Sequence, residues 1–174
     1  FDKIVRELTI EHLESCEQLL RILAAMKELG LATIIIEEEY VDIDYLDAFS
    51  SYYSKLFTPY NQFCIRLHFF SKTIEMNDLI DLSNHKKFYL GYSVIRPIRS
   101  FQVSRTLLRS PCDDSHSNYT LCKASFKVNL AGNKLEVLGM PFMQQDTNVC
   151  ICAEASMWMV SLYMHQRHGY SRFL

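Results

Sequence analysis

Apolar residues recur at helical spacing in two parts of the chain, one toward each end. The first helix is predicted over residues 9–29, where Thr9 is suited to be the N-cap and Gly30 to end the helix. The second is predicted over residues 152–168, and Gly169 follows it. The apolar stripes are Leu13, Cys16, Leu20, Leu23 and Ala24 in the first helix, and Ala155, Trp158, Met159, Leu162 and Tyr163 in the second.

Runs of β-branched and aromatic residues fill the middle of the chain and predict strands. The predicted strands cover residues 31–37, 63–70, 88–98 and 101–108. The run over 63–70 is apolar on both faces, which is typical of a central strand. Residues 119–130 and 134–138 flank the turn formers Ala131-Gly132-Asn133 and predict a β-hairpin.

A further helix is predicted over residues 44–56, with Asp44 as its cap and Pro59 ending it. The aromatic residues on one side of this helix, which favour the core, are Tyr45, Phe49, Tyr52 and Tyr53. The three glutamates at positions 37–39 predict a solvated turn before it.

The order of these elements predicts the fold class. A short helix capped by Thr73 is expected over residues 73–82, and the turn formers of residues 110–118 predict a loop. Helices come first, strands cluster in the middle and a helix returns at the end. We therefore expect an α+β fold with N-terminal helices and a central, mostly antiparallel sheet.

Composition narrows the class of protein further. The chain has 174 residues, of which 49% are apolar and 22% charged, so it has the composition of a cored globular protein rather than a disordered one. No apolar run approaches the ~18 residues that span a bilayer, so no membrane partner is expected. No leader precedes the first predicted helix, and position 1 is Phe. We expect a fragment of a longer protein.

The six cysteines lack the spacing of a disulfide framework, which favours reduced thiols and a cytoplasmic protein. Cys150 and Cys152 are one residue closer than the usual zinc pair, and no second pair follows. We therefore predict no metal and no cofactor.

Charge is distributed unevenly. Residues 1–50 carry 12 acidic and 4 basic side chains, whereas residues 51–174 carry 8 and 14. The stretch from Lys86 to Arg109 contains six basic residues and no acidic one. It could contact phosphates, but the sequence pI of about 6.3 argues against a nucleic-acid binder. We favour the interpretation that it faces the acidic N-terminal part of its own chain or an acidic partner. For Arg96, which closes an apolar strand, a buried ion pair with an N-terminal acid is expected.

The segment over residues 140–159 carries the candidate chemistry. Cys152 stands at the start of the last predicted helix, where the partial positive charge of the helix N-terminus favours the thiolate that attacks carbonyl carbons. Backbone N–H groups at that terminus can hold a developing oxyanion, and Gln145 offers a carboxamide as a second donor. Cys150 is the second choice of nucleophile. The structural alternative for Cys152 is a small apolar residue buried at a helix start.

This segment resembles the nucleophile region of papain-like cysteine peptidases, especially the bacterial leader-peptide-processing (bacteriocin-type) branch. The matching residues are Pro141-Phe142, Gln145-Asp146 and Cys152-Ala153-x-Ala155-Ser156-x-x-Met159. Ala153 stands where the family has glycine. The resemblance covers about twenty residues, and it implies that Cys152 is the nucleophile and Gln145 the oxyanion donor. It also implies a peptide or protein substrate and a catalytic histidine well after the cysteine.

The sequence offers no clear candidate for the catalytic histidine that the resemblance implies. His165 lies thirteen residues along the same helix, about 20 Å from Cys152 at ~1.5 Å rise per residue, and His168 is farther still. The base must come from beyond Leu174, from another chain, or from His68 or His116; otherwise the site is inactive. For His68, a structural role in an apolar strand is favoured. We expect residues 1–139 to form an added α+β region and residues 140–174 to begin an incomplete papain-like core.

Two functions of different classes follow. The first is thiol-mediated hydrolysis or transfer at a peptide or isopeptide carbonyl by Cys152 and Gln145. The second is a non-catalytic interaction module that binds an acidic partner or nucleic acid through the basic stretch over residues 86–109. The sequence leaves the oligomeric state open.

Overall fold

The computed structural model describes residues 16–98, 100, 102–110, 121–145 and 152–171. Its centre is a five-stranded antiparallel sheet in the order β1-β2-β3-β4-β7. The strands are β1 (Thr33–Tyr40), β2 (Cys64–Phe70), β3 (Tyr89–Ile95), β4 (Val103–Leu108) and β7 (Pro141–Phe142). β2 lies between β1 and β3, which confirms the prediction that this run is internal to the sheet.

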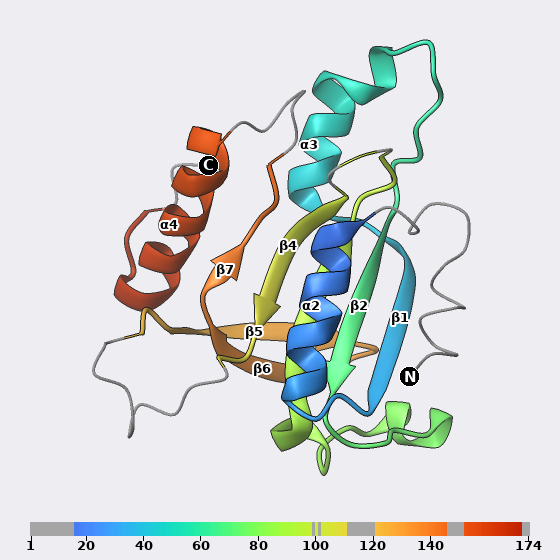
Figure 1. Ribbon diagram of the computed structural model, residues 1–174, viewed down its shortest axis with the longest axis vertical. Helices are drawn as coiled ribbons and strands as arrows, with labels where there is room; N and C mark the ends of the chain where they lie inside the picture. Colours follow the sequence, from blue (N-terminus) through green and yellow to red (C-terminus); the bar gives the residue numbers. More distant parts are fainter. Residues whose placement is uncertain (1–15, 99, 101, 111–120, 146–151, 172–174) are drawn as a thin grey trace.

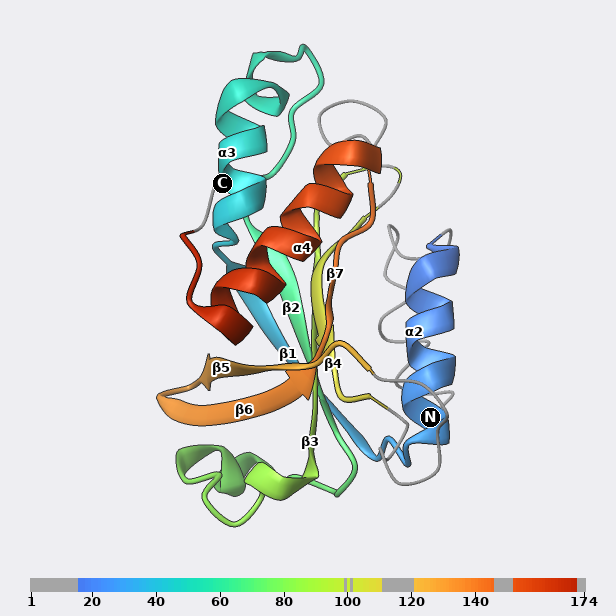
Figure 2. The ribbon, with the colours of Figure 1, turned by 90° about the vertical axis from the view of Figure 1, so that its left-hand side faces the viewer.

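Both faces of the sheet are covered, because successive side chains of a strand point to opposite faces. On one face α2 (Glu17–Glu28) packs its Leu19 and Met26 onto Leu67 and Phe69 of β2. On the other face lie α4 (Cys152–His168) and the hairpin of β5 (Ala124–Leu130) and β6 (Asn133–Gly139). Figure 2 views the sheet nearly edge-on, with α2 on one side and α4 and the hairpin on the other.

The predicted fold class is confirmed: helices precede an antiparallel sheet and the last helix begins at Cys152 (Figure 1). Gly169 ends that helix with a φ of 72°, and its N–H donates to the carbonyl of His165 at 2.9 Å. The predicted hairpin also forms, but residues 121–123 of its first predicted strand are not part of β5, and Asn133 of the predicted turn belongs to β6. Ala131 and Gly132 between its strands both have positive φ, the conformation of the two-residue turns that suit the twist of a hairpin.

The predicted face of the first helix was partly wrong. Leu20 is 53% exposed and Ala24 is exposed, whereas Leu19, Ile22 and Met26 are buried beside Leu23. Apolar residues recur at helical spacing on two neighbouring faces of this helix, and only the face that contacts the sheet is buried. The predicted start of this helix at Thr9 lies outside the described residues.

The predicted turn at the three glutamates was also wrong, because residues 37–39 belong to β1. Glu37 pairs with Arg66 of β2, and the register then shifts by way of a bulge, with Glu39 at a φ of 53°. Burial of Glu37 against two basic partners on β2 outweighs the tendency of a charged run to form a turn. The predicted loop at 110–118 lies almost wholly outside the described residues.

The short helices differ in their limits. α3 (Ile43–Ser51) is capped by Asp42 rather than Asp44, since Asp42 accepts a hydrogen bond from the Tyr45 N–H at 3.0 Å. Three single turns of 3-10 helix follow along the chain: η1 (Tyr53–Lys55), η2 (Met76–Ile80) and η3 (Lys86–Phe88). η2 replaces the predicted helix over residues 73–82.

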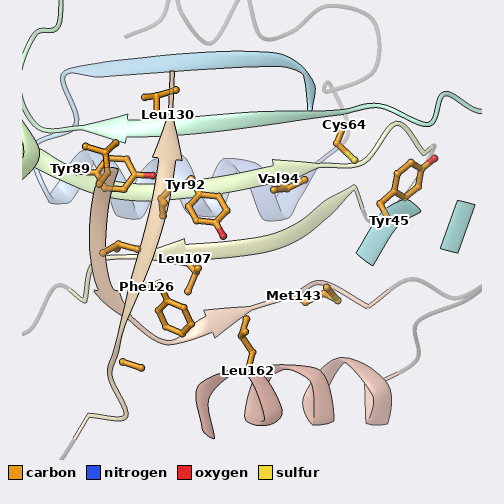
Figure 3. Close-up of a cluster of buried hydrophobic side chains, with 14 of the residues drawn as sticks. Tyr45, Cys64, Tyr89, Tyr92, Val94, Leu107, Phe126, Leu130, Met143 and Leu162 are labelled. Carbon is orange, nitrogen blue, oxygen red and sulfur yellow. The ribbon is translucent and has the colours of Figure 1, made fainter. Parts of the chain in front are cut away.

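A close approach of backbones explains how the hairpin meets the sheet. A Cβ on Gly139, at the end of β6, would lie 2.2 Å from the carbonyl oxygen of Leu108 in β4, so only glycine fits there. The contact draws β6 onto the sheet and helps form one core from β2, β3, the hairpin and α4. Figure 3 shows members of that core, including Leu130 and Phe126 of β5 and Leu162 of α4. Among the described residues no helix is both long and apolar enough to cross a bilayer.

Candidate thiol site at the start of helix α4

Cys152 is the first residue of α4, and its side chain is exposed. The helix is fixed in place by Ala155, Trp158 and Leu162, which the stripe predicted and which are all buried. The first N–H groups of a helix have no partner within it and point out of its N-terminus. An exposed sulfur at this position therefore lies beside donors that can hold a negative charge. The alternative of a buried, purely structural Cys152 does not apply.

Gln145 contacts this sulfur directly. The Cys152 thiol donates a hydrogen bond to the carboxamide oxygen of Gln145, which stands seven residues earlier in the sequence. Both side chains are exposed. A carboxamide carries an oxygen and an NH2 at nearly the same reach, so a half-turn of the Gln145 side chain presents its two N–H donors at the sulfur. The described structure thus brings together the two residues that the sequence paired.

The backbone before Gln145 is held tightly. Gln144 forms two hydrogen bonds with Val103 of β4: its N–H donates to the Val103 carbonyl at 3.3 Å, and its Oε1 accepts from the Val103 N–H at 3.2 Å. The guanidinium of Arg96 donates to the Gln144 carbonyl at 3.1 Å. These bonds tie the segment that follows β7 to β4 and to Arg96, directly before Gln145.

Arg105 links the start of α3 to α4. Its guanidinium forms an ion pair with Asp44 and lies 5.4 Å from the centre of the Trp158 ring. Burial tends to lower the pKa of Arg105, but Asp44 outweighs it and raises the pKa above its ordinary value, so the arginine is charged. This arginine of the basic stretch therefore faces an acidic residue of its own N-terminal region.

The sequence did not reveal these positioning roles. Arg96 is buried and donates to backbone carbonyls of Val103 and Gln144. An ion pair had been expected; Arg96 does act electrostatically on Asp42, where it opposes the effect of burial, which raises the pKa of that carboxyl. The sequence indicated only that Arg96 is a charged residue at the end of an apolar strand. Its partners could not be predicted, because they come together only when the segments around Val103 and Gln144 meet. Gln144 gave no indication beyond its place beside Gln145.

Within the described residues no histidine forms a hydrogen bond with Cys152. His165 and His168 lie in the last turn of the same helix, and His165 donates from Nδ1 to the Tyr170 carbonyl at 2.7 Å. His68 is fully buried in β2. His116 and the second-choice nucleophile Cys150 lie outside the described residues. The described part of the chain supplies the thiol and the carboxamide but no base in contact with them.

His68 instead belongs to a buried polar network. Its Nε2 lies 3.3 Å from the Glu37 carboxylate, and its Nδ1 lies 2.9 Å from the Tyr89 hydroxyl. Burial lowers the pKa of His68. In the neutral ring Nε2 therefore donates to the carboxylate and Nδ1 accepts from the hydroxyl. Burial acts to raise the pKa of Glu37, but the bonds to His68 and Arg66 outweigh it and hold that pKa below its usual value. The structural role predicted for His68 fits this network.

No group of three or more potential metal ligands occurs among the described histidines, cysteines and acids. No family model, curated protein or solved structure was found that matches the chain. The candidate site is therefore defined by its own geometry: an exposed thiol at a helix N-terminus in contact with an anchored glutamine.

Proposed function

We propose that the chain carries the nucleophile half of a papain-like thiol site, which acts on a peptide or isopeptide carbonyl. The observation that carries the proposal is the contact between the exposed Cys152 thiol, at the first residue of α4, and the Gln145 carboxamide. The resemblance of residues 141–159 to the papain-like nucleophile segment supports the same two roles. The boundary between an added region at 1–139 and a catalytic core from 140 stays a prediction.

The chemistry is acyl transfer. The thiolate of Cys152 attacks the carbonyl carbon, and the resulting oxyanion is held by the Cys152 N–H and the Gln145 side chain. The carbon–nitrogen bond then breaks, the amine leaves with a proton from the general acid, and a thioester remains on the sulfur. Water or another nucleophile releases the acyl group. The imidazole that first accepts the thiol proton and later donates it must come from outside the described residues or from another chain.

A peptide-based electrophile tests this function without a complete site. We expect a peptidyl acyloxymethyl ketone to form a thioether with Cys152, because the thiolate attacks the methylene carbon beside the ketone and the carbon–oxygen bond to the carboxylate leaving group breaks. The reaction is followed by intact mass and by peptide mapping of the native chain. The Cys152→Ser variant should form no such adduct, and Gln145→Ala should slow the reaction by about a hundredfold through loss of an oxyanion donor.

Cys122 provides the matched control, since it is also an exposed free cysteine. The Cys122→Ser variant should react as the parent chain does. Equal modification of Cys122 and Cys152, or a rate that Gln145→Ala leaves unchanged, would refute the proposed function.

The second candidate function is binding without catalysis through the basic stretch over 86–109. The observation that favours it is the exposure of Lys86, Lys87 and Arg109 at one groove, whereas Arg96 and Arg105 of the same stretch are used inside the fold. Only part of the stretch is thus available to a partner.

A further inference from the structure

A groove of about 970 Å³ lies between η3, the end of β4 and the β5–β6 hairpin. Among the described residues, its lining includes six cationic side chains and a single carboxylate, that of Glu136. The cationic residues are Lys86, Lys87, Arg109, Lys123, Lys127 and Lys134. They are six of the 18 basic residues in a chain whose net charge is −2, so positive charge is concentrated here against the overall balance. We call this surface the basic groove.

The cations of the basic groove come from three separate parts of the sequence. Lys86 and Lys87 belong to η3, Arg109 follows β4, and Lys127 and Lys134 lie on β5 and β6. Lys127 and Lys134 are exposed, since they occupy the outward positions of hairpin strands whose alternate residues are buried. These charges come together only in the folded chain. The basic stretch over 86–109 therefore indicated only three of the six cations that line the basic groove.

Among the described residues, few negative charges lie near the six cations of the basic groove. Glu136 accepts a hydrogen bond from Ser125, and Asp81 is close enough to Lys86 to interact with it electrostatically. The side chains of Lys127, Lys134 and Arg109 form no hydrogen bond or ion pair with the described residues, although Lys127 lies directly opposite Glu136 in the hairpin. Like charges gathered at this density repel one another, and a bound polyanion relieves that repulsion. The surface is therefore suited to a ligand with several negative charges.

The lining distinguishes between kinds of polyanion. Single-stranded nucleic acid binds where exposed aromatic rings stack on its bases. Tyr89 is the one aromatic residue that lines the groove in the described part of the chain. It is 2% exposed and its hydroxyl is bonded to His68, so it offers no stacking surface. The apolar part of the lining comes from aliphatic residues of the hairpin, among them Leu138, which is 48% exposed. Aliphatic contacts beside ammonium groups suit carboxylates interleaved with apolar side chains.

We propose that the basic groove binds an acidic polypeptide segment in which glutamate or aspartate alternates with apolar residues. This inference rests on the second candidate function, binding through basic residues, and it is independent of the thiol chemistry. Cys152 starts α4 at the end away from the β5–β6 hairpin (Figure 2), so the two surfaces can be altered separately.

Fluorescence anisotropy tests the proposal, with a labelled peptide of alternating glutamate and leucine as the probe. We expect saturable binding that weakens as salt is added, and about tenfold weaker binding by the double variant Lys127→Gln, Lys134→Gln. The matched control is Lys55→Gln, Arg167→Gln, which removes two exposed charges elsewhere on the surface and should bind as the parent chain does. A peptide with glutamine in place of glutamate should not bind.

Three results would overturn the proposal. These are no binding of the acidic peptide, equal loss of binding in the two double variants, and tighter binding of single-stranded oligothymidylate than of the peptide. The reaction of Cys152 with the acyloxymethyl ketone is also measured on the variant Lys127→Gln, Lys134→Gln. Because this reaction does not involve the basic groove, it shows separately whether the thiol site has failed.

Discussion

Cys64 and Cys152 are both free thiols, and the fold places them in opposite surroundings. Cys64 begins β2, is 1% exposed and belongs to the hydrophobic core. Figure 3 shows its side chain between those of Val94 and Tyr45. Burial, with a smaller effect of Asp42, raises the pKa of Cys64 to about 12. Cys152 is exposed at a helix N-terminus and contacts Gln145. The comparison shows that the fold shields one sulfur from solvent and places the other at the surface beside a carboxamide.

The histidines divide in the same way. His68 is locked in a buried network with Glu37 and Tyr89, whereas His165 and His168 are exposed at the far end of α4. Neither environment brings an imidazole to Cys152 among the described residues. The described chain thus holds the exposed Cys152 thiol apart from these histidines, which lie in a buried network or on the surface.

Among the expected effects on stability, the largest distinguishes the two thiols. Cys64→Ser places a hydroxyl in a buried apolar site, and we expect it to lower the free energy of unfolding by about 1–3 kcal/mol. Cys152→Ser changes an exposed position and should alter that free energy by less than about 0.5 kcal/mol. Urea unfolding followed by circular dichroism measures both variants. Equal destabilisation by the two substitutions would contradict the assignment of Cys64 to the core.

A smaller effect is expected from His68 as pH falls. Its pKa is lower in the folded chain than the ordinary value of about 6.5 in the unfolded chain, so below pH 6.5 the unfolded state binds more protons. Stability should therefore decrease as pH drops from about 6.5 toward the folded pKa, with a slope of at most about 1.4 kcal/mol per pH unit. Glu37, whose pKa is also lowered, adds a decrease of the same sign at lower pH.

Chemical unfolding at a series of pH values measures this slope. His68→Gln should reduce it, while His165→Gln, which changes an exposed histidine, should leave it as it is. A slope that persists in full in His68→Gln would contradict the buried network.

Local patterns were sufficient to predict much of the fold. The last helix is predicted to the residue at both ends, because its apolar stripe, its polar surroundings and Gly169 agree. The hairpin followed from the turn chemistry at Ala131 and Gly132. Where the sequence failed, tertiary contacts decided the outcome: Glu37 is drawn into β1 by Arg66 and His68, and the sheet selects Leu19 and Met26 as the buried face of α2.

The candidate site was also predictable only as far as its residues are local in the sequence. Cys152 and Gln145 are only seven residues apart in the sequence, so a local pattern could pair them. Arg96 and Arg105 act through partners far along the chain, at Gln144 and Asp44, and no local pattern indicates such pairings. The basic groove was hidden for the same reason, since its cations converge only when the hairpin folds over the sheet.

The most direct test of the account compares three thiols in one experiment. The native chain is treated with iodoacetamide at pH 7, and the labelling rates of Cys152, Cys122 and Cys64 are measured by peptide mapping. We expect Cys152 to react about tenfold faster than the exposed Cys122, because the N–H groups at the start of α4 and the Gln145 carboxamide lie beside its sulfur. Cys64, with a pKa of about 12, should react about a thousandfold more slowly than Cys122. A Cys152 that reacts no faster than Cys122 would contradict the claim that the start of α4 is a nucleophilic site.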